Sequence, residues 1–233
     1  MELKCPSCAR PQPPRLICSE CGSPLGAEID CFAALGLPRR LVLDLADLER
    51  RYHALGREVH PDRFAGAAAT MRAASLTSTA LLTRSYRTLR DPVSRGLYWL
   101  ELSGASLAEN NKGVAPDLAA LVFEVQEELA ELTAADERGR ATLAAQAAAR
   151  RAELRALIDA AMDALGRNFA RWDESAAARE AAGNDNGESS RNGGGEKLLA
   201  ELKTTLSRIA YLRTLLRDID RALEPAQSVA DRL

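Results

Sequence analysis

From residue 45 onward, apolar side chains recur every three or four positions, which is the spacing of one helix face. Asp44 fits an N-cap, with Asp47 three residues later in a box-like arrangement. The helix that follows is expected to end at His60, because Pro61 lacks an N–H and disfavours helical backbone at the residue before it. The apolar stripe of this helix consists of Leu45, Leu48, Tyr52, Leu55 and Val59.

A second helix is predicted from about residue 68 to residue 90, where Asp91 and Pro92 end it. Its inner face is expected to carry Leu81, Leu82, Tyr86 and Leu89. A shorter helix through residues 97–100 follows. The first two helices are therefore expected to lie antiparallel, with a tight polar loop at their tip.

Three longer helices are predicted in the C-terminal half, and they are expected to form a bundle. The first begins at Pro116, and the others cover about 137–172 and 197–223. The stripe of the first consists of Leu118, Leu121, Val122, Val125, Leu129 and Leu132. Residues 175–196 are polar and rich in Gly and Asn, so we expect a mobile insert there. We see no tandem repeat in the sequence.

The composition supports an all-α fold, because strand-favouring aromatic residues make up only 4% of the chain. We expect a cysteine-rich module at 1–26, a helical hairpin at 29–103, a linker at 104–115 and a three-helix domain at 116–233. A net charge of −2 argues against a nucleic-acid binder. No apolar run is long enough for a membrane helix, and residues 1–5 resemble neither a signal peptide nor a presequence, so a cytoplasmic location is the expectation.

Two Cys-x-x-Cys pairs, Cys5 with Cys8 and Cys18 with Cys21, favour a metal site. Four thiolates match a closed, tetrahedral structural zinc site, and iron fits the same geometry. The alternative is a pair of redox or disulfide cysteines, which a reducing compartment disfavours. Cys31 is left over and fits a small buried apolar residue.

His60 and Asp62 lie together in the loop between the first two helices. They fit either a catalytic dyad or a recognition loop, and the adjoining sequence offers neither a nucleophile nor a metal ligand for a dyad. Arg50 and Arg57 share the helix face opposite the apolar stripe. They fit either a basic docking patch or ordinary solvated arginines.

Acidic residues crowd one face of the helix that begins at Pro116. Phe123 and Ala120 lie on this face, together with Glu124, Glu127 and Glu131. One interpretation is a solvated helix with a single stray apolar residue, because exposed apolar residues are common. The other is a docking site with an apolar anchor and an acidic rim.

The segment Glu58-Val59-His60-Pro61-Asp62-Arg63-Phe64 resembles the J-domain signature. The flanking segments resemble the HscB branch of that family: they are Cys31-Phe32-x-x-Leu35-Gly36-Leu37-Pro38, Tyr86-x-x-Leu89-x-Asp91-Pro92 and Arg95-Gly96-Leu97-Tyr98-Trp99-Leu100. The resemblance covers residues 29–103 closely and the C-terminal half in outline. Thr83 departs from it, since relatives usually carry Asn there.

The resemblance implies a co-chaperone that is not itself an enzyme. It implies that His60, Pro61 and Asp62, with Arg50, Arg57 and Arg63, dock on a DnaK/HscA-type chaperone and trigger its ATP hydrolysis. It further implies that the iron–sulfur scaffold protein IscU binds a second surface formed by Ala119, Ala120, Phe123, Glu124, Glu127, Glu131 and Tyr211. Ala119 and Ala120 replace bulkier apolar residues of the family.

Two other functions remain open at this point. One is a general J-protein that binds unfolded clients through a zinc-finger substrate site. The other is a redox enzyme or nucleic-acid binder built on the four cysteines, which the charge balance and the lack of an evident active site oppose.

Overall fold

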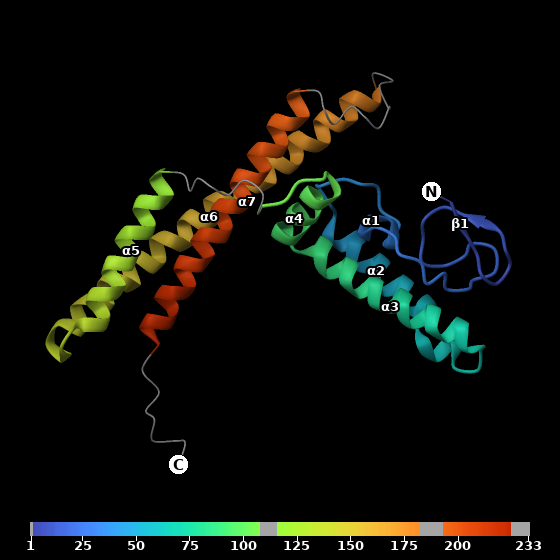
Figure 1. The fold of residues 1–233 in the computed structure, drawn as a ribbon, viewed down its shortest axis with the longest axis horizontal. Helices are drawn as coiled ribbons and strands as arrows, with labels where there is room; N and C mark the ends of the chain where they lie inside the picture. Colours follow the sequence, from blue (N-terminus) through green and yellow to red (C-terminus); the bar gives the residue numbers. More distant parts are fainter. Residues whose placement is uncertain (1, 108–115, 182–192, 225–233) are drawn as a thin grey trace, which may run out of the picture. The chain divides into compact units, whose positions relative to one another are not determined.

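The computed structural model describes residues 2–107, 116–181 and 193–224, and Figure 1 shows its fold. The chain forms two compact units. The described residues of Met1–Leu102 and Trp172–Gly183 belong to the first unit, and those of Ser103–Arg171 and Asn184–Leu233 to the second. Within the described residues, no helix is long and apolar enough to cross a membrane.

Helices dominate the described residues, which confirms the all-α prediction. The strands are two short segments in the cysteine module, β1 (Leu3–Lys4) and β2 (Pro11–Gln12), which pair antiparallel. The module belongs to the same compact unit as the helices that follow it. The boundaries 1–26, 29–103, 104–115 and 116–233 stay predictions, and most of the predicted linker lies outside the described residues.

The first unit contains α1 (Cys31–Ala34), α2 (Leu45–Val59), a 3-10 turn η1 (Pro61–Phe64), α3 (Ala69–Arg90) and α4 (Pro92–Leu102). As predicted, α2 and α3 pack side by side, and the short η1 segment connects them (Figure 1). Helix α3 also contacts α1, η1 and α4, so it is the central helix of this unit. The largest fully buried side chains of the unit are Phe32, Leu35, Leu41, Leu48, Leu82, Leu89 and Leu100.

The start of α2 follows the prediction in one respect and departs from it in two. The Asp44 side chain accepts hydrogen bonds from the N–H groups of Ala46 and Asp47, as an N-cap does. The box-like arrangement with Asp47 is wrong, because this carboxylate binds Arg50 and Arg51 instead. Leu45 was expected in the buried stripe but is 50% exposed, since it lies in the first turn of the helix.

The second unit contains α5 (Pro116–Ala134), most of α6 (Glu137–Ala181) and α7 (Gly193–Leu223). Helix α5 packs against α7. Hydrogen bonds join α6 to α7, from Asn168 to Thr205 and from Arg171 to Glu201. The predicted stripe of α5 contributes Leu118, Val125 and Leu132 to the core. The buried residues of α6 and α7 include Leu154, Leu165, Phe169, Leu202, Leu206, Ile209, Leu212 and Ile219.

Two helix ends differ from the prediction. Helix α6 continues nine residues past Trp172, and α7 begins at Gly193 rather than at residue 197. Helical turns therefore occupy both ends of the predicted insert 175–196, and its centre, 182–192, lies outside the described residues. The extension of α6 contains three consecutive alanines, the residue with the highest helix propensity.

The end of α6 is also held by contacts within the first unit. Both carboxylate oxygens of Asp173 accept backbone hydrogen bonds, from Leu41 N at 2.9 Å and from Val42 N at 2.8 Å. Trp172 meets Trp99 of α4 edge-on, with ring centroids 5.8 Å apart. These contacts join residues more than 70 positions apart, so local sequence patterns gave no sign of them.

A four-cysteine metal site and two candidate docking surfaces

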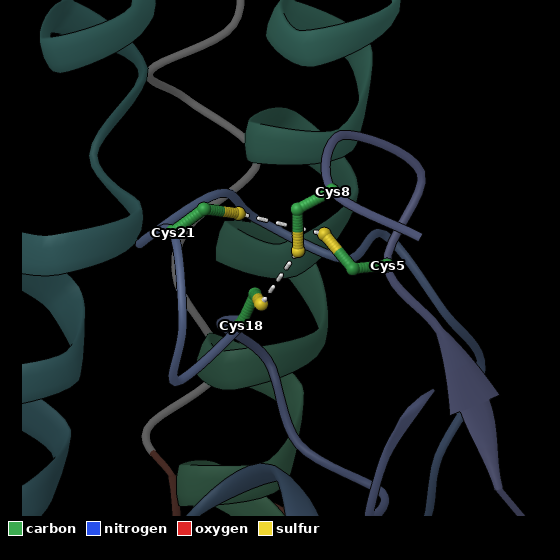
Figure 2. Close-up of side chains that lie close together, drawn as sticks. All are labelled: Cys5, Cys8, Cys18 and Cys21. Carbon is green, nitrogen blue, oxygen red and sulfur yellow. Dashed lines mark hydrogen bonds between the residues drawn. The ribbon is translucent and has the colours of Figure 1, made fainter. Parts of the chain in front are cut away.

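Cys5, Cys8, Cys18 and Cys21 converge on one point, and their sulfur atoms all lie within 4.8 Å of one another (Figure 2). The Sγ atoms of Cys5 and Cys21 are 3.6 Å apart, and those of Cys8 and Cys18 are 3.7 Å apart. A tetrahedral zinc ion with Zn–S bonds of about 2.3 Å sets its sulfurs about 3.8 Å apart. The spacing of the four sulfurs therefore fits a tetrahedral metal ion.

The same spacing excludes disulfide bonds in this structure. A disulfide holds its sulfurs about 2.05 Å apart, and all five cysteines here are free. Cys31 lies apart from the cluster and is buried in α1, as predicted for a small apolar residue. Of the two interpretations left open by the sequence, the geometry therefore favours metal binding.

The two halves of the module repeat each other at an offset of 13 residues. In the first half the Ala9 N–H donates to Cys5 O, and in the second the Gly22 N–H donates to Cys18 O. Both residues have left-handed backbone, with φ of 59° and 69°. The β1–β2 pair Lys4 with Pro11 corresponds to the bridge of Ile17 with Pro24.

Our sequence analysis missed this repeat. The signal was Cys-x-x-Cys-x-x-Pro, which occurs at Cys5–Pro11 and again at Cys18–Pro24. Each copy is a turn that aims two thiols inward, and two copies bring together four thiols, the number that a tetrahedral ion needs. The repeat explains why the two cysteine pairs approach the same point from opposite sides.

The protonation of the thiols is uneven. A hydrogen bond with the Ser23 hydroxyl, 3.3 Å from Cys21 Sγ, lowers the pKa of Cys21 to about 6. At Cys8 a hydrogen bond from the Arg10 backbone acts to lower the pKa, but desolvation and the three other thiols outweigh it and raise the pKa to about 12. Thiols this close cannot all ionise without a cation among them, which is what a bound metal ion supplies.

The module rests on α3 through Gly26. The Gly26 N–H donates to the Ser78 hydroxyl at 3.3 Å, and a Cβ at Gly26 would lie 3.0 Å from both Cα and Cβ of Ala74. Gly26 also has a φ of +59°, which L side chains rarely adopt. Both the backbone conformation and the close approach therefore require glycine at this position.

At the tip between α2 and α3, His60 and Asp62 are exposed and Pro61 is half-buried. The side chains of His60 and Asp62 are 54% and 90% exposed. His60 Nδ1 accepts a hydrogen bond from the Asp62 N–H at 3.2 Å and lies 3.5 Å from the Asp62 carboxylate. The exposure of both side chains suits a recognition loop.

Two hydroxyl groups on α3 fix the base of the tip. Ser75 Oγ donates to the Val59 carbonyl at 2.6 Å, and Thr79 Oγ1 donates to the same oxygen at 3.2 Å. Val59 is fully buried and is the last residue of α2, directly before His60. A buried carbonyl at a helix end needs such partners, and here they also set the direction in which the tip leaves α2.

The three arginines predicted beside the tip are exposed but differ in their partners. Arg50 forms an ion pair with Asp47 at 3.0 Å, whereas Arg63 donates to the Arg57 carbonyl at 3.4 Å. Among the described residues, Arg57 and Arg63 form no ion pair with an acid, and both line a hollow of about 440 Å³ next to His60. Two guanidinium groups are thus available for an acidic partner.

The predicted acidic surface, here called the α5 face, consists of Ala119, Ala120, Phe123, Glu124, Glu127 and Glu131. Phe123 is 72% exposed, the largest exposed fraction among the large apolar side chains described. Ala120 and all three glutamates are exposed, while Ala119 is half-buried. Tyr211 is half-buried on α7, the helix that packs against α5.

One residue of this region was missed by the sequence analysis. Arg150 of α6 forms ion pairs with Glu124, Glu128 and Glu153. The segment from residue 117 to residue 137 contains seven acids and no basic residue, so the sequence alone showed no counter-ion for the negative charge of the α5 face. The counter-ion comes from another helix, 22 positions beyond Glu128, where no local pattern points to it.

The fold is that of solved HscB chaperones. The structure of chaperone HscB from Vibrio cholerae matches with a TM-score of 0.55 and 22% identity, over 83% of this chain and 96% of that one. The crystal structure of the human co-chaperone protein HscB matches with a TM-score of 0.59 and 24% identity, over 94% and 97% of the two chains. At these identities the likeness concerns the fold alone, which is an HscB-type fold.

Sequence comparison is more specific. No family model matches the chain. The Co-chaperone protein HscB homolog of Bordetella avium is 35% identical over 153 residues, which cover 63% of this chain and 90% of the relative. Homologs from Azoarcus and Bordetella pertussis are 37% and 40% identical over shorter matches, 62% and 54% of their lengths. The chain belongs to the HscB co-chaperone family, as the sequence motifs predicted.

Proposed function

We propose that this co-chaperone binds an iron–sulfur scaffold protein of the IscU type and stimulates the ATPase of a DnaK/HscA-type chaperone, so that a cluster is passed on. The observation that carries the proposal is the His60-Pro61-Asp62 tip between the packed helices α2 and α3, where the side chains of His60 and Asp62 are exposed. Membership of the HscB family supports the same function. One body that holds both cargo and trigger raises the effective concentration of the cargo at the chaperone.

The chaperone would dock at the tip and along α2. Arg57 and Arg63 lie beside His60 without an acidic partner among the described residues, and they suit an acidic surface on the ATPase. Arg50 is a weaker contributor, because its guanidinium is already paired with Asp47. Rim charges of this kind act mainly on the association rate, so the docking should weaken with added salt.

The scaffold protein would dock on the α5 face. Phe123 supplies an exposed apolar anchor, and Glu124, Glu127 and Glu131 supply an acidic rim on the same helix. Such an anchor surrounded by charges is the form of an interface hot spot. Ala119, Ala120 and Tyr211 would complete the surface. The resulting partner is a protein with a basic rim around an apolar pocket.

Zinc is the ion that we assign to the cysteine module, in a structural role. Four thiolates fill its coordination sphere and leave no position for a substrate. The module's own apolar cluster is small, with Cys5, Cys18 and Leu25 buried in it, so the bound ion would contribute much of its folding free energy. Iron fits the same ligands.

The proposal is tested with two variants in a paired assay. ATP hydrolysis by a DnaK/HscA-type chaperone is measured with and without an IscU-type scaffold protein, and scaffold binding is measured by calorimetry. His60→Gln should abolish stimulation and leave scaffold binding unchanged. Phe123→Ala should weaken scaffold binding by about tenfold, as expected for a hot-spot residue, and leave stimulation in the absence of scaffold unchanged.

Leu76→Ala is the matched control for Phe123→Ala, because Leu76 is also exposed, at 59%, but lies on α3. It should bind the scaffold protein like wild type. If Phe123→Ala also binds at wild-type strength, the α5 face is not the cargo site. If the wild-type chain stimulates the ATPase with unfolded clients but does not bind the scaffold protein, it is a general J-protein instead.

A further inference from the structure

The guanidinium group of Arg150 lies among three carboxylates from two helices. Its Nε and Nη2 atoms donate to Glu128 of α5, at 3.1 and 2.6 Å to Oε1, and Nη1 donates to Glu153 of α6 at 3.0 Å. Nη2 also lies 3.4 Å from a carboxylate oxygen of Glu124. Glu124 is the residue of this group that belongs to the α5 face.

The three pairs differ in strength. The pair with Glu128 is short and forked, and both side chains are largely covered, with exposed fractions of 22% for Arg150 and 30% for Glu128. The pair with Glu124 is longer, and the Glu124 side chain is 55% exposed. Arg150 is therefore anchored by Glu128, while it holds Glu124 loosely and leaves that carboxylate open to a competitor.

We infer that Arg150 is an internal counter-ion of the α5 face. When the docking protein binds, one of its cationic side chains replaces Arg150 as the ion-pair partner of Glu124. The inference rests on the proposed function, since it assumes that this face binds a scaffold protein. A partner that brings a lysine or arginine to Glu124 replaces one ion pair with another. A partner with a neutral residue at this place forms no new ion pair to offset the loss of the pair between Glu124 and Arg150. The arrangement therefore selects for a basic partner.

Two substitutions should change the affinity for the scaffold protein in opposite directions. Arg150→Gln removes the competing cation and leaves Glu124 free, so a basic scaffold protein should bind more tightly. Glu128→Gln removes the anchor of Arg150, whose guanidinium can then pair more closely with Glu124, so the scaffold protein should bind more weakly. The remaining hydrogen bond to Glu153 keeps Arg150 charged and in place in this second variant.

Arg151→Gln is the matched control. Arg151 is the next residue of α6 and carries the same charge, but its acidic neighbour is Asp220 of α7, at 3.7 Å. A general effect of net charge on association would change both variants equally. An effect through Glu124 should appear in Arg150→Gln and be much smaller in Arg151→Gln.

The test measures binding of an IscU-type scaffold protein to the full chain at several salt concentrations. Arg150→Gln should bind about threefold more tightly than wild type at about 50 mM salt, with a gain that fades at high salt. In a chain that already carries Glu124→Gln, Arg150→Gln should not raise the affinity, since Arg150 then has no charged Glu124 to compete for. Thermal unfolding of each variant shows whether it is folded, and Glu128→Gln tests the opposite sign independently.

The outcomes separate the inference from the proposed function. If Arg150→Gln matches Arg151→Gln, or if its gain persists without Glu124, Arg150 merely ties α5 to α6 and the inference is overturned. If wild type does not bind the scaffold protein at any salt concentration, the proposed function fails and the inference fails with it. Tighter binding by Arg150→Gln together with weaker binding by Glu128→Gln supports the inference.

Discussion

The Ser75 hydroxyl of α3 donates to the Val59 carbonyl, the last carbonyl of α2, at 2.6 Å. Through this bond the second helix of the hairpin holds the residue directly before the His60-Pro61-Asp62 tip. Both Ser75 and Val59 are fully buried, so water cannot substitute for the lost donor. The direction of the tip thus depends on a side chain that lies 15 positions beyond His60 in the sequence.

Ser75→Ala should therefore lower the free energy of unfolding by about 1–2 kcal/mol, because it leaves the buried carbonyl with the longer bond from Thr79 alone. Urea denaturation measures this loss. Thr79→Ala removes the weaker donor and should have a smaller effect. Equal stability of Ser75→Ala and wild type would show that Thr79 alone satisfies the carbonyl. We further expect faster amide exchange at the tip in Ser75→Ala.

Cys8→Ser should abolish metal binding, because it removes one of the four thiols that would hold the ion, and the module depends on the ion for much of its folding free energy. Elemental analysis of the purified protein should find about one zinc per chain in wild type. Cys31→Ser is the control, since Cys31 is buried in α1 away from the cluster. Retention of a full metal equivalent by Cys8→Ser would contradict the assignment of these four ligands.

Gly26→Ala should destabilise the first unit and loosen the module from α3. The new methyl group meets Ala74 at 3.0 Å, and the residue has a φ of +59°. Gly104→Ala is a matched control, because Gly104 has a φ of +71° with nothing within 4 Å. Backbone strain alone costs about 1–2 kcal/mol, and the clash should add about as much again. If thermal unfolding gives both variants the same loss, the contact with Ala74 is not tight.

Asp30 should make stability depend on pH in the acid range. Burial acts to raise its pKa, but hydrogen bonds from the Ala33 N–H and from Arg39 outweigh this and lower the pKa below its ordinary value of 3.8. A carboxyl whose pKa is lower in the folded state stabilises the fold above the pKa of the unfolded chain, and this stabilisation is lost as the pH falls through the folded value.

The substitution Asp30→Asn removes this dependence. At neutral pH the variant should unfold at lower urea concentration than wild type, and the gap should narrow toward about pH 3. A gap that stays constant over this range would mean that the Asp30 charge does not contribute. Arg39→Gln removes the ion pair with Asp30 while leaving the N-cap bond to Ala33, so it should show part of the same effect.

Much of the fold followed from local patterns. Helix α2 begins after Asp44 and ends before Pro61, as predicted, because capping and the missing proline N–H act within a few residues. The four-cysteine cluster was also recognisable, since the two Cys-x-x-Cys pairs are visible in the sequence itself. These features have in common that the residues that determine them are close together in the sequence.

The features that the sequence analysis missed or predicted wrongly depend mainly on residues that are far apart in the sequence. The last part of α6 is held in the first unit by Asp173, whose carboxylate accepts hydrogen bonds from residues 131 and 132 positions earlier. Arg150 reaches the α5 face from another helix. The exposure of Leu45 likewise required the tertiary structure, since hydrophobic spacing does not say which end of a stripe is covered.

The bond from Asp173 to the backbone of Leu41 and Val42 bears on the order in which the protein matures on the ribosome. The hairpin is synthesised early, but these two amide groups obtain their acceptor only after a further 130 or so residues have emerged. When Leu102 has just emerged from the ribosome, the first unit of the nascent chain therefore still lacks the end of α6. Protease resistance around residue 41 should consequently appear late in translation, when the end of α6 arrives.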